Sequence, residues 1–304
     1  MPTSLRSLPT DENPERHERP KRRLPVYRAG GSREPTFVAL QAKERSLLPD
    51  VAPLDVDGLR ARPMLSANAK TTVSLDFPIG HTCDPTPACA SVCYGAVPRA
   101  AATWRKSLRK RLRNLRYVLE APPEEAAARL AKEFRAAQRR WAPRARLDFL
   151  RVNGTGDLFP QVLPVIRLFA EANPDVRVWI VTRRFDLAAR VPALPNVYLQ
   201  LSLDASTPPA LEREACEIVA RHPRAYLSFL RTSPGDDTRG AAIVFNEKRT
   251  RGLPFDSKTD CPADAGRLPL GNVRGVGGTA CARCRKCFSD ATVERQRRLP
   301  GSAA

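Results

Sequence analysis

Residues 176–204 read VRVWIVTRRFDLAARVPALPNVYLQLSLD. Residues 176–182 are almost wholly apolar, as expected for a strand buried on both faces of a sheet, and residues 196–204 form a second apolar run. Between them, residues 186–191 fit a short helix. A strand, a helix and a strand in this order predict two parallel strands joined by a right-handed crossover.

The same alternation continues on both sides of this unit. About six strands are visible in total, fewer than the eight of a closed barrel. We therefore expect an α/β fold, a partial (β/α) barrel of about six mostly parallel strands. The other expected strands cover residues 71–77, 146–152, 225–230 and 241–245, and the other expected helices cover residues 104–119, 123–141, 161–172 and 210–221.

Composition divides the chain into four parts. Residues 1–63 begin with a stretch rich in Pro, Arg and Glu and continue through prolines, which predicts a disordered basic tail and a linker. Residues 64–253 hold the barrel pattern. Residues 254–290 lose the apolar periodicity and contain four cysteines, which predicts a loop held by metal. Residues 291–304 are expected to be a flexible tail.

The chain is strongly basic. Its net charge is +19, its isoelectric point is near 10.3, and it contains 42 arginines and 9 lysines. Arginine pairs with phosphate through two parallel hydrogen bonds, so nucleic acid is one candidate partner, and a GC-rich coding sequence is the alternative source of the arginines. If nucleic acid binds, the expected surface is one face of the 104–119 helix. The alternative is that this face is simply charged and solvated. The residues of the face are Arg105, Lys106, Arg109, Lys110, Arg113 and Arg116, with Arg111 beside them.

The N-terminus lacks the apolar run of a signal peptide, and the chain is longer than most disulfide-stabilised secreted domains. We therefore expect a cytoplasmic protein. No stretch approaches the roughly 20 apolar residues of a membrane helix, so a soluble protein is expected. Neither the oligomeric state nor the substrate follows from the sequence.

Seven of the eight cysteines fall in two groups. The second group is Cys261 with Cys281, Cys284 and Cys287, and its C-x2-C-x2-C run resembles ferredoxin-type ligand spacing, with Cys261 as the fourth ligand. Zinc also accepts four thiolates, but usually from paired C-x2-C motifs. The even spacing therefore favours a 4Fe-4S cluster, with zinc as the alternative.

The first group, Cys83, Cys89 and Cys93, contains three cysteines. Three thiolates on a 4Fe-4S cluster leave one iron open, whereas a structural zinc would need a fourth ligand, for which His81 is a candidate. Buried thiols without metal are a further alternative, as is one site shared by both groups. Cys216 falls in a helical pattern and is expected to be a core residue.

Polar residues follow several of the expected strands, and the C-terminal ends of parallel strands share one edge of a sheet. The glycines of this set would let backbone approach a ligand, and its aspartates would bind an ammonium group or ribose hydroxyls. For residues 154–157, the alternative is an ordinary helix N-terminal turn capped by Asp157. The candidate cofactor-binding residues are Gly154, Thr155, Gly156, Asp157, Ser202 and Asp204.

Several motifs in order resemble the phage gene product 88 family, whose function is not established. The resemblance runs from about Leu65 to Phe288. Its motifs are Ser66 to Lys70, Cys83 to Tyr94, Gly154 to Asp157, and Cys281 to Cys287.

The cysteine loop after the first barrel strand and the glycine-rich turn after the second also resemble, more distantly, radical S-adenosylmethionine (SAM) enzymes. That resemblance implies that Cys83, Cys89 and Cys93 hold a 4Fe-4S cluster whose open iron binds SAM. It also implies that residues 154–157 contact the methionine part of SAM, that Ser202 or Asp204 contacts its ribose, and that the second group holds an auxiliary cluster. The family spacing is C-x3-C-x2-C, whereas this chain has C-x5-C-x3-C.

We therefore expect an iron–sulfur protein that resembles radical SAM enzymes. The alternative is a zinc-stabilised, non-enzymatic nucleic-acid-binding protein of phage origin.

Overall fold

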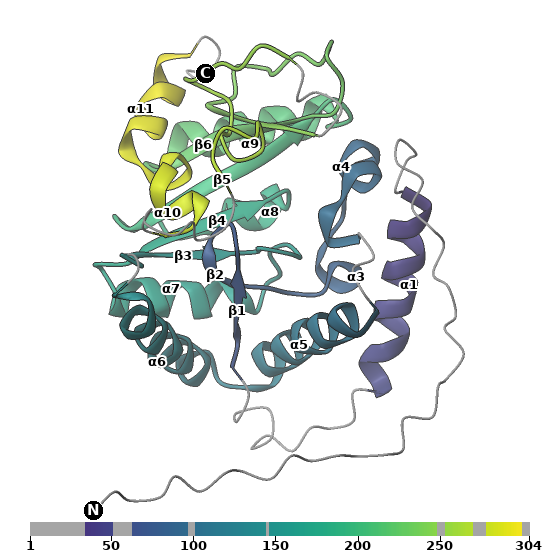
Figure 1. The fold of residues 1–304 in the computed structure, drawn as a ribbon, viewed down its shortest axis with the longest axis vertical. Coiled ribbons are helices and arrows are strands. Elements are labelled where there is room, and N and C mark those ends of the chain that lie inside the picture. The colour runs from purple at the N-terminus through teal and green to yellow at the C-terminus, as the bar shows by residue number, and fades with distance from the viewer. Residues whose placement is uncertain are drawn as a thin grey trace, which may run out of the picture. The chain divides into compact units, whose positions relative to one another are not determined.

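The computed structural model describes residues 34–50, 63–96, 101–143, 146–247, 253–269 and 278–299, and for residues 34–36, 47–50 and 101–106 it describes the backbone alone. These residues form a mixed α/β fold built on one sheet (Figure 1). The strands are β1 (Leu65–Asn68), β2 (Thr72–Leu75), β3 (Phe149–Val152), β4 (Arg177–Thr182), β5 (Val197–Asp204), β6 (Ala225–Arg231) and β7 (Ile243–Asn246).

The seven strands lie in the sheet in their chain order. β1 pairs with β2 in the antiparallel direction, and each later neighbouring pair is parallel. The predicted alternation and the mostly parallel strands are therefore confirmed. The sheet is not closed, because β1 and β7 are its two edges.

Helices separate most of the parallel strands. α7 joins β3 to β4, α8 joins β4 to β5, and α9 joins β5 to β6, as the sequence predicted. The helices are α1 (Glu34–Asp50), α3 (Ile79–Thr82), α4 (Pro87–Val92), α5 (Ala101–Glu120), α6 (Pro123–Trp141), α7 (Val162–Ala172), α8 (Phe185–Ala188), α9 (Pro209–Arg221), α10 (Ala280–Cys284) and α11 (Asp290–Arg298), with short 3-10 turns η1 (Tyr94–Ala96) and η3 (Lys286–Phe288).

One face of the sheet carries the main hydrophobic core. Side chains alternate along a strand, so Leu150 and Val152 point to this face, where Ile180 and Leu201 join them. Buried side chains of α6, α7 and α9, including Phe134, pack against the same cluster. The continuous apolar runs of β4 and β5 are explained by burial on both faces, as predicted.

The opposite face carries aromatic residues, and the C-terminal segment covers part of it. Phe149 stacks on Phe288 of η3 with ring centroids 4.2 Å apart, and Trp179 lies 5.9 Å from the same ring. Cys281, Cys287 and Val293 belong to the same buried cluster. Figure 1 shows α10 and α11 beside β4, β5 and β6. This packing fixes the second cysteine group against the sheet.

The hairpin of β1 and β2 differs from the sequence expectation, which began the sheet at residue 71. Asn68 closes the turn, because its side-chain oxygen accepts hydrogen bonds from the backbone N–H groups of Lys70 (3.0 Å) and Thr71 (2.6 Å). β1 is short and carries polar residues, so it gave no strand pattern. Its pairing with β2 adds the antiparallel edge.

The predicted boundaries of the tails also need correction. α1 lies in the stretch expected to be tail and linker, yet Phe37 and Leu40 are buried against α3, α4 and α5. α11 lies in the expected C-terminal tail, yet Gln296 is 1% exposed and accepts a hydrogen bond from the Leu227 N–H at 2.9 Å. The remaining predicted tail and linker residues, 1–33, 51–62 and 300–304, lie outside the described residues.

Among the helices described above, we find none long and apolar enough to cross a lipid bilayer.

Candidate metal centres

The first cysteine group follows β2, at the C-terminal end of the first parallel strand, as predicted. Cys83 ends α3, Cys89 lies within α4, and Cys93 ends α4. Burial is the main cause that raises the pKa of Cys83, and Asp157, Cys93 and Cys89 add to it. Burial and the neighbouring Cys89 raise the pKa of Cys93 to about 11. The three thiols are therefore close enough to repel one another when ionised.

α1 holds this cysteine loop in place. The Gly80 N–H donates to the Glu44 carboxylate at 2.5 Å, and the Arg45 guanidinium donates to the Gly80 carbonyl at 2.7 Å. The Gln41 amide donates to the Cys83 carbonyl at 3.4 Å. A Cβ on Gly80 would lie 2.8 Å from the Gln41 carbonyl oxygen, so the close approach of α1 requires glycine there. His81, the candidate zinc ligand, contacts the Glu44 carbonyl through its Nε2 at 3.1 Å.

Arg111 brings a buried positive charge to the first group. Its side chain lies 3.8 Å from Glu44, and the residue is 4% exposed. The Arg111 Nε and Nη1 atoms are buried without a hydrogen-bond partner, and the charge lowers the pKa of Cys93 against the larger effect of burial. Unpaired buried donors are costly, so these atoms fit a site that takes negative charge, as a thiolate-bound cluster does.

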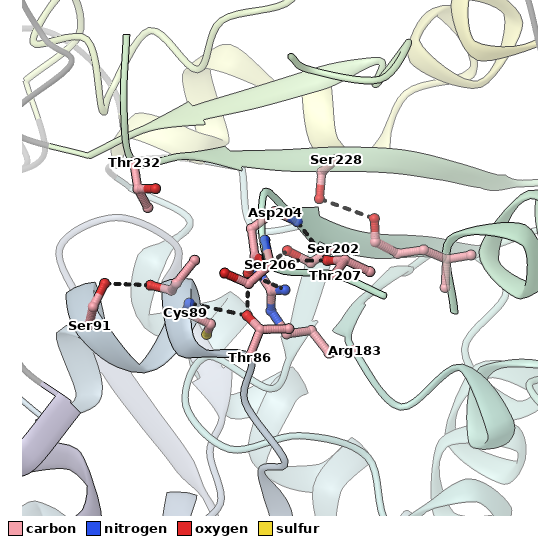
Figure 2. Close-up of polar contacts among 12 residues, drawn as sticks. Thr86, Cys89, Ser91, Arg183, Ser202, Asp204, Ser206, Thr207, Ser228 and Thr232 are labelled. Atoms are coloured by element: carbon pink, nitrogen blue, oxygen red, sulfur yellow. Dashed lines mark hydrogen bonds and ion pairs between the residues drawn. The ribbon is translucent and has the colours of Figure 1, made fainter. Parts of the chain in front are cut away.

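Asp204 anchors the cysteine loop to the end of β5. Its carboxylate is fully buried, accepts a hydrogen bond from Thr86 at 2.5 Å and pairs with Arg183 at 2.7 Å. Arg183 also donates to Ser202 at 3.3 Å and hydrogen-bonds the Cys89 thiol. Figure 2 shows Thr86, Arg183 and Asp204 pointing towards one another beside Cys89. Asp204 and Ser202, predicted from their place at a strand end, therefore lie next to the first group.

The glycine-rich turn after β3 packs against the lead-in to the same loop. A Cβ on Gly154 would lie 2.2 Å from the Asp76 carboxylate, and Gly156 has φ +81° and faces Phe77. The Thr155 N–H donates to Asp76 at 3.1 Å. The structure thus gives both glycines a packing role. The predicted contact of residues 154–157 with a cofactor stays a prediction.

Asp157 is held by protein groups. Its carboxylate accepts hydrogen bonds from Thr182 (2.5 Å) and from the backbone N–H groups of Leu158 (2.7 Å) and Arg183 (3.0 Å). These bonds tie the ends of β3 and β4 together. Asp157 therefore joins two strand ends, and it does not cap the following helix, because the N-cap of α7 is Gln161.

Burial raises the pKa of Asp157 from 3.8 to about 6, against the effect of these hydrogen bonds. An acid whose pKa is raised on folding contributes its stability below its unfolded pKa and loses it as the pH rises through the folded value. Relative to wild type, Asp157→Asn is therefore expected to become more stable by about 1 kcal/mol between pH 5 and pH 7. Urea unfolding of both proteins at the two pH values measures this change, and a constant difference would contradict it.

The second cysteine group comes from two distant segments. Cys261, Cys281, Cys284 and Cys287 line one cavity together with Lys70. Burial raises the pKa of Cys261 to about 11 and that of Cys281 to about 12, against the opposing effect of the Lys70 charge. Burial first, and then the other three thiols, raise the pKa of Cys287 well above its ordinary value. The predicted grouping of these four cysteines is thus present in the structure.

Lys70 places a positive charge beside these thiols. Its carbonyl accepts the Cys281 N–H at 2.9 Å, and its ammonium pairs with Asp264 at 2.8 Å. Burial lowers the pKa of Lys70, but Asp264, Cys261 and Cys281 together raise it above its ordinary value. The β1–β2 turn therefore contributes a cation to a site formed by the C-terminal segment.

All eight cysteines are free thiols. Across the described ranges, no three His, Cys, Asp or Glu side chains stand close enough together to share a metal ion. Both groups nevertheless fit a thiolate-bound metal in donor chemistry, because each gathers thiols beside a cation, the buried Arg111 for the first group and the half-buried Lys70 for the second. Metal binding would require the thiols of each group to move closer together. Cys216 packs against the main core.

Only part of the predicted nucleic-acid-binding face of α5 is exposed to solvent among the described residues. Arg111 points inward, which corrects its placement on that face. Lys110 donates to the Leu65 carbonyl, and Arg116 pairs with Glu120 at 2.6 Å. Arg109 is exposed and Arg113 is half-buried, while the side chains of Arg105 and Lys106 lie outside the described residues. Fewer of the described basic groups face solvent than the sequence pattern indicated.

Sequence reasoning missed four charged residues near the cysteines: Glu44, Lys70, Arg111 and Arg151. Glu44 and Arg111 stand among other charged residues in their helices, and their contacts are between distant segments. A charged residue on the apolar stripe of each helix was the available signal.

Comparison with known proteins identifies a family to which the chain is similar. Neither the curated proteins nor the solved structures contain a significant match to this chain. The sequence profile of the gene product 88 family matches residues 55–290, which is more than three quarters of the 304 residues and includes both cysteine groups. The resemblance predicted from the motifs is confirmed, and the chain belongs to the gene product 88 family.

Proposed function

We propose that this protein binds iron–sulfur clusters at two sites, one held by Cys83, Cys89 and Cys93 and the other by Cys261, Cys281, Cys284 and Cys287. The observation that carries the proposal is that four cysteines from two segments of the chain line one cavity beside the half-buried Lys70. Buried thiols with raised pKa values stay protonated by themselves, and a bound metal would displace those protons and hold the sulfurs as thiolates.

The two groups have different numbers of thiols. Four thiolates complete the protein ligands of a 4Fe-4S cluster, whereas three leave one iron for an external ligand. We therefore propose a structural or electron-transfer role for the second group and a cofactor-binding role for the first. SAM is the proposed external ligand because of the resemblance to radical SAM enzymes. This makes a radical SAM-like enzyme the proposed activity class.

The residues around the first group would position that ligand. Ser202 accepts a hydrogen bond from Arg183 and still has a hydroxyl proton to donate. Asp204 and Asp157 already hold protein partners, so they would act by fixing the cysteine loop and the end of β4. Of the predicted cofactor residues, Ser202 is therefore the one we propose for direct contact.

Metal analysis of the full chain, purified without oxygen, tests the proposal. We expect iron and acid-labile sulfide together with visible absorption from thiolate–iron bonds. A colourless protein with stoichiometric zinc would contradict the iron–sulfur proposal and support the zinc-stabilised alternative. Metal-free protein that unfolds with the same midpoint before and after a chelator would contradict both, because a structural metal contributes to folding.

Nucleic-acid binding remains the alternative proposal for the basic surface. The geometry favours the metal proposal over it because the inward Arg111 and the paired Arg116 leave less of α5 for phosphate.

A further inference from the structure

Arg151 lies on the sheet face against which the second cysteine group packs. It is on β3, opposite Trp179 of β4, and its guanidinium stacks on that ring at 4.9 Å from the centroid. This places it on the aromatic face, against which the second cysteine group packs. Its charge also interacts with Tyr94, next to Cys93 of the first group, and with Cys281 and Cys287 of the second. Arg151 is thus within electrostatic reach of the second group and of Tyr94.

The guanidinium of Arg151 has a donor without a hydrogen-bond partner. Among the described residues, its buried Nε makes no hydrogen bond, and the guanidinium stacks on the Trp179 ring. Unlike Arg111, the residue is only half-buried, so part of the side chain is open to a ligand. A guanidinium with unused donors matches the two oxygens of a carboxylate or phosphate.

The acidic groups near Arg151 leave its Nε without a hydrogen bond. The Asp76 carboxylate acts on its charge and already accepts the Thr155 N–H at 3.1 Å. Lys70 acts on the nearby Tyr94 hydroxyl, and its ammonium is paired with Asp264. Tyr94 is 54% exposed and lies close enough to contribute a hydroxyl to a bound group.

We propose that Arg151 binds a carboxylate or phosphate group of the substrate, beside Tyr94 and the second cysteine group. This deepens the proposed function, on which its identification as a substrate site rests. The stack on Trp179 fixes the plane of the guanidinium, so that two parallel hydrogen bonds to an oxyanion form without reordering the side chain. The substrate class is accordingly a small molecule or residue that carries an anionic group.

Calorimetric titration of the full-length protein with inorganic phosphate, and separately with acetate, tests the proposal at fixed ionic strength. We expect one of the two anions to bind the wild type, and the one that does so identifies the group. Arg151→Gln should weaken that binding at least about tenfold. Arg151→Lys should restore part of it, because lysine keeps the charge without the planar pair of donors. Arg213→Gln, on the exposed side of α9, should bind as the wild type does.

Metal content, measured on the same samples, separates this proposal from the preceding one. Loss of anion binding in Arg151→Gln with unchanged metal supports it. It is overturned if Arg151→Gln binds as wild type does, if neither anion binds the wild type, or if Arg151→Gln loses metal, because Arg151 would then serve the cluster. A metal-free wild type with Arg151-dependent anion binding would sink the iron–sulfur proposal and leave the anion site standing.

Discussion

Cys287→Ser is expected to remove about half of the iron and sulfide from the anaerobically purified protein, because each cysteine group would hold one 4Fe-4S cluster. Cys93→Ser should remove the other half. The Cys287 side chain lines the cavity of the second group, and its carbonyl accepts the Tyr226 hydroxyl at 2.7 Å. Serine keeps that backbone contact, so metal loss would reflect the thiol. Iron and sulfide analysis of each variant measures the effect.

Cys216→Ser is the matched control. Cys216 packs against the main core outside both groups, so this variant should keep its full metal content. If either Cys287→Ser or Cys93→Ser removes all the metal, the two groups form one shared site. Equal metal in all three variants and the wild type would contradict metal binding by these thiols.

Glu44→Ala is expected to destabilise the protein by about 3–5 kcal/mol, because it leaves the buried Arg111 without its carboxylate. Glu44 is 1% exposed, lies 3.8 Å from Arg111 and accepts the Gly80 N–H at 2.5 Å. The same change removes a contact that joins α1 to the first cysteine loop. We therefore also expect metal loss from the first group and not from the second. Denaturant unfolding and metal analysis measure the two effects.

Two further variants sharpen this test. Glu44→Gln keeps an oxygen for the Gly80 N–H but removes the charge, so its loss of metal should be smaller than that of Glu44→Ala. Val38→Ala changes a side chain on α1 that is 58% exposed and should alter stability by less than about 0.5 kcal/mol. If Glu44→Ala is as stable as Val38→Ala, α1 does not stabilise the cysteine loop in the way the contacts indicate.

The pattern of apolar residues was sufficient to locate the central strands of the sheet, but it was not sufficient to locate the elements at its edge and at the N-terminal side. The runs of β4 and β5 are apolar because they are buried on both faces, so hydrophobicity alone located them. β1 is four residues long and partly exposed, and its pairing with β2 depends on the Asn68 turn. α1 has several apolar residues but no clear helical periodicity, and burial of Phe37 and Leu40 against α3 and α4 accounts for its packing. Tertiary contacts set these boundaries.

For the candidate sites, the sequence by itself predicted how the cysteines group, and it determined that the first group follows a parallel strand, because spacing and strand ends are local features. The tertiary structure alone decided which charges surround the thiols. Glu44, Lys70, Arg111 and Arg151 reach the two groups from α1, the β1–β2 turn, α5 and β3. Electrostatic interactions act through space and have no fixed spacing along the chain, so the sequence could mark a buried charge on an apolar helix stripe but not its partners.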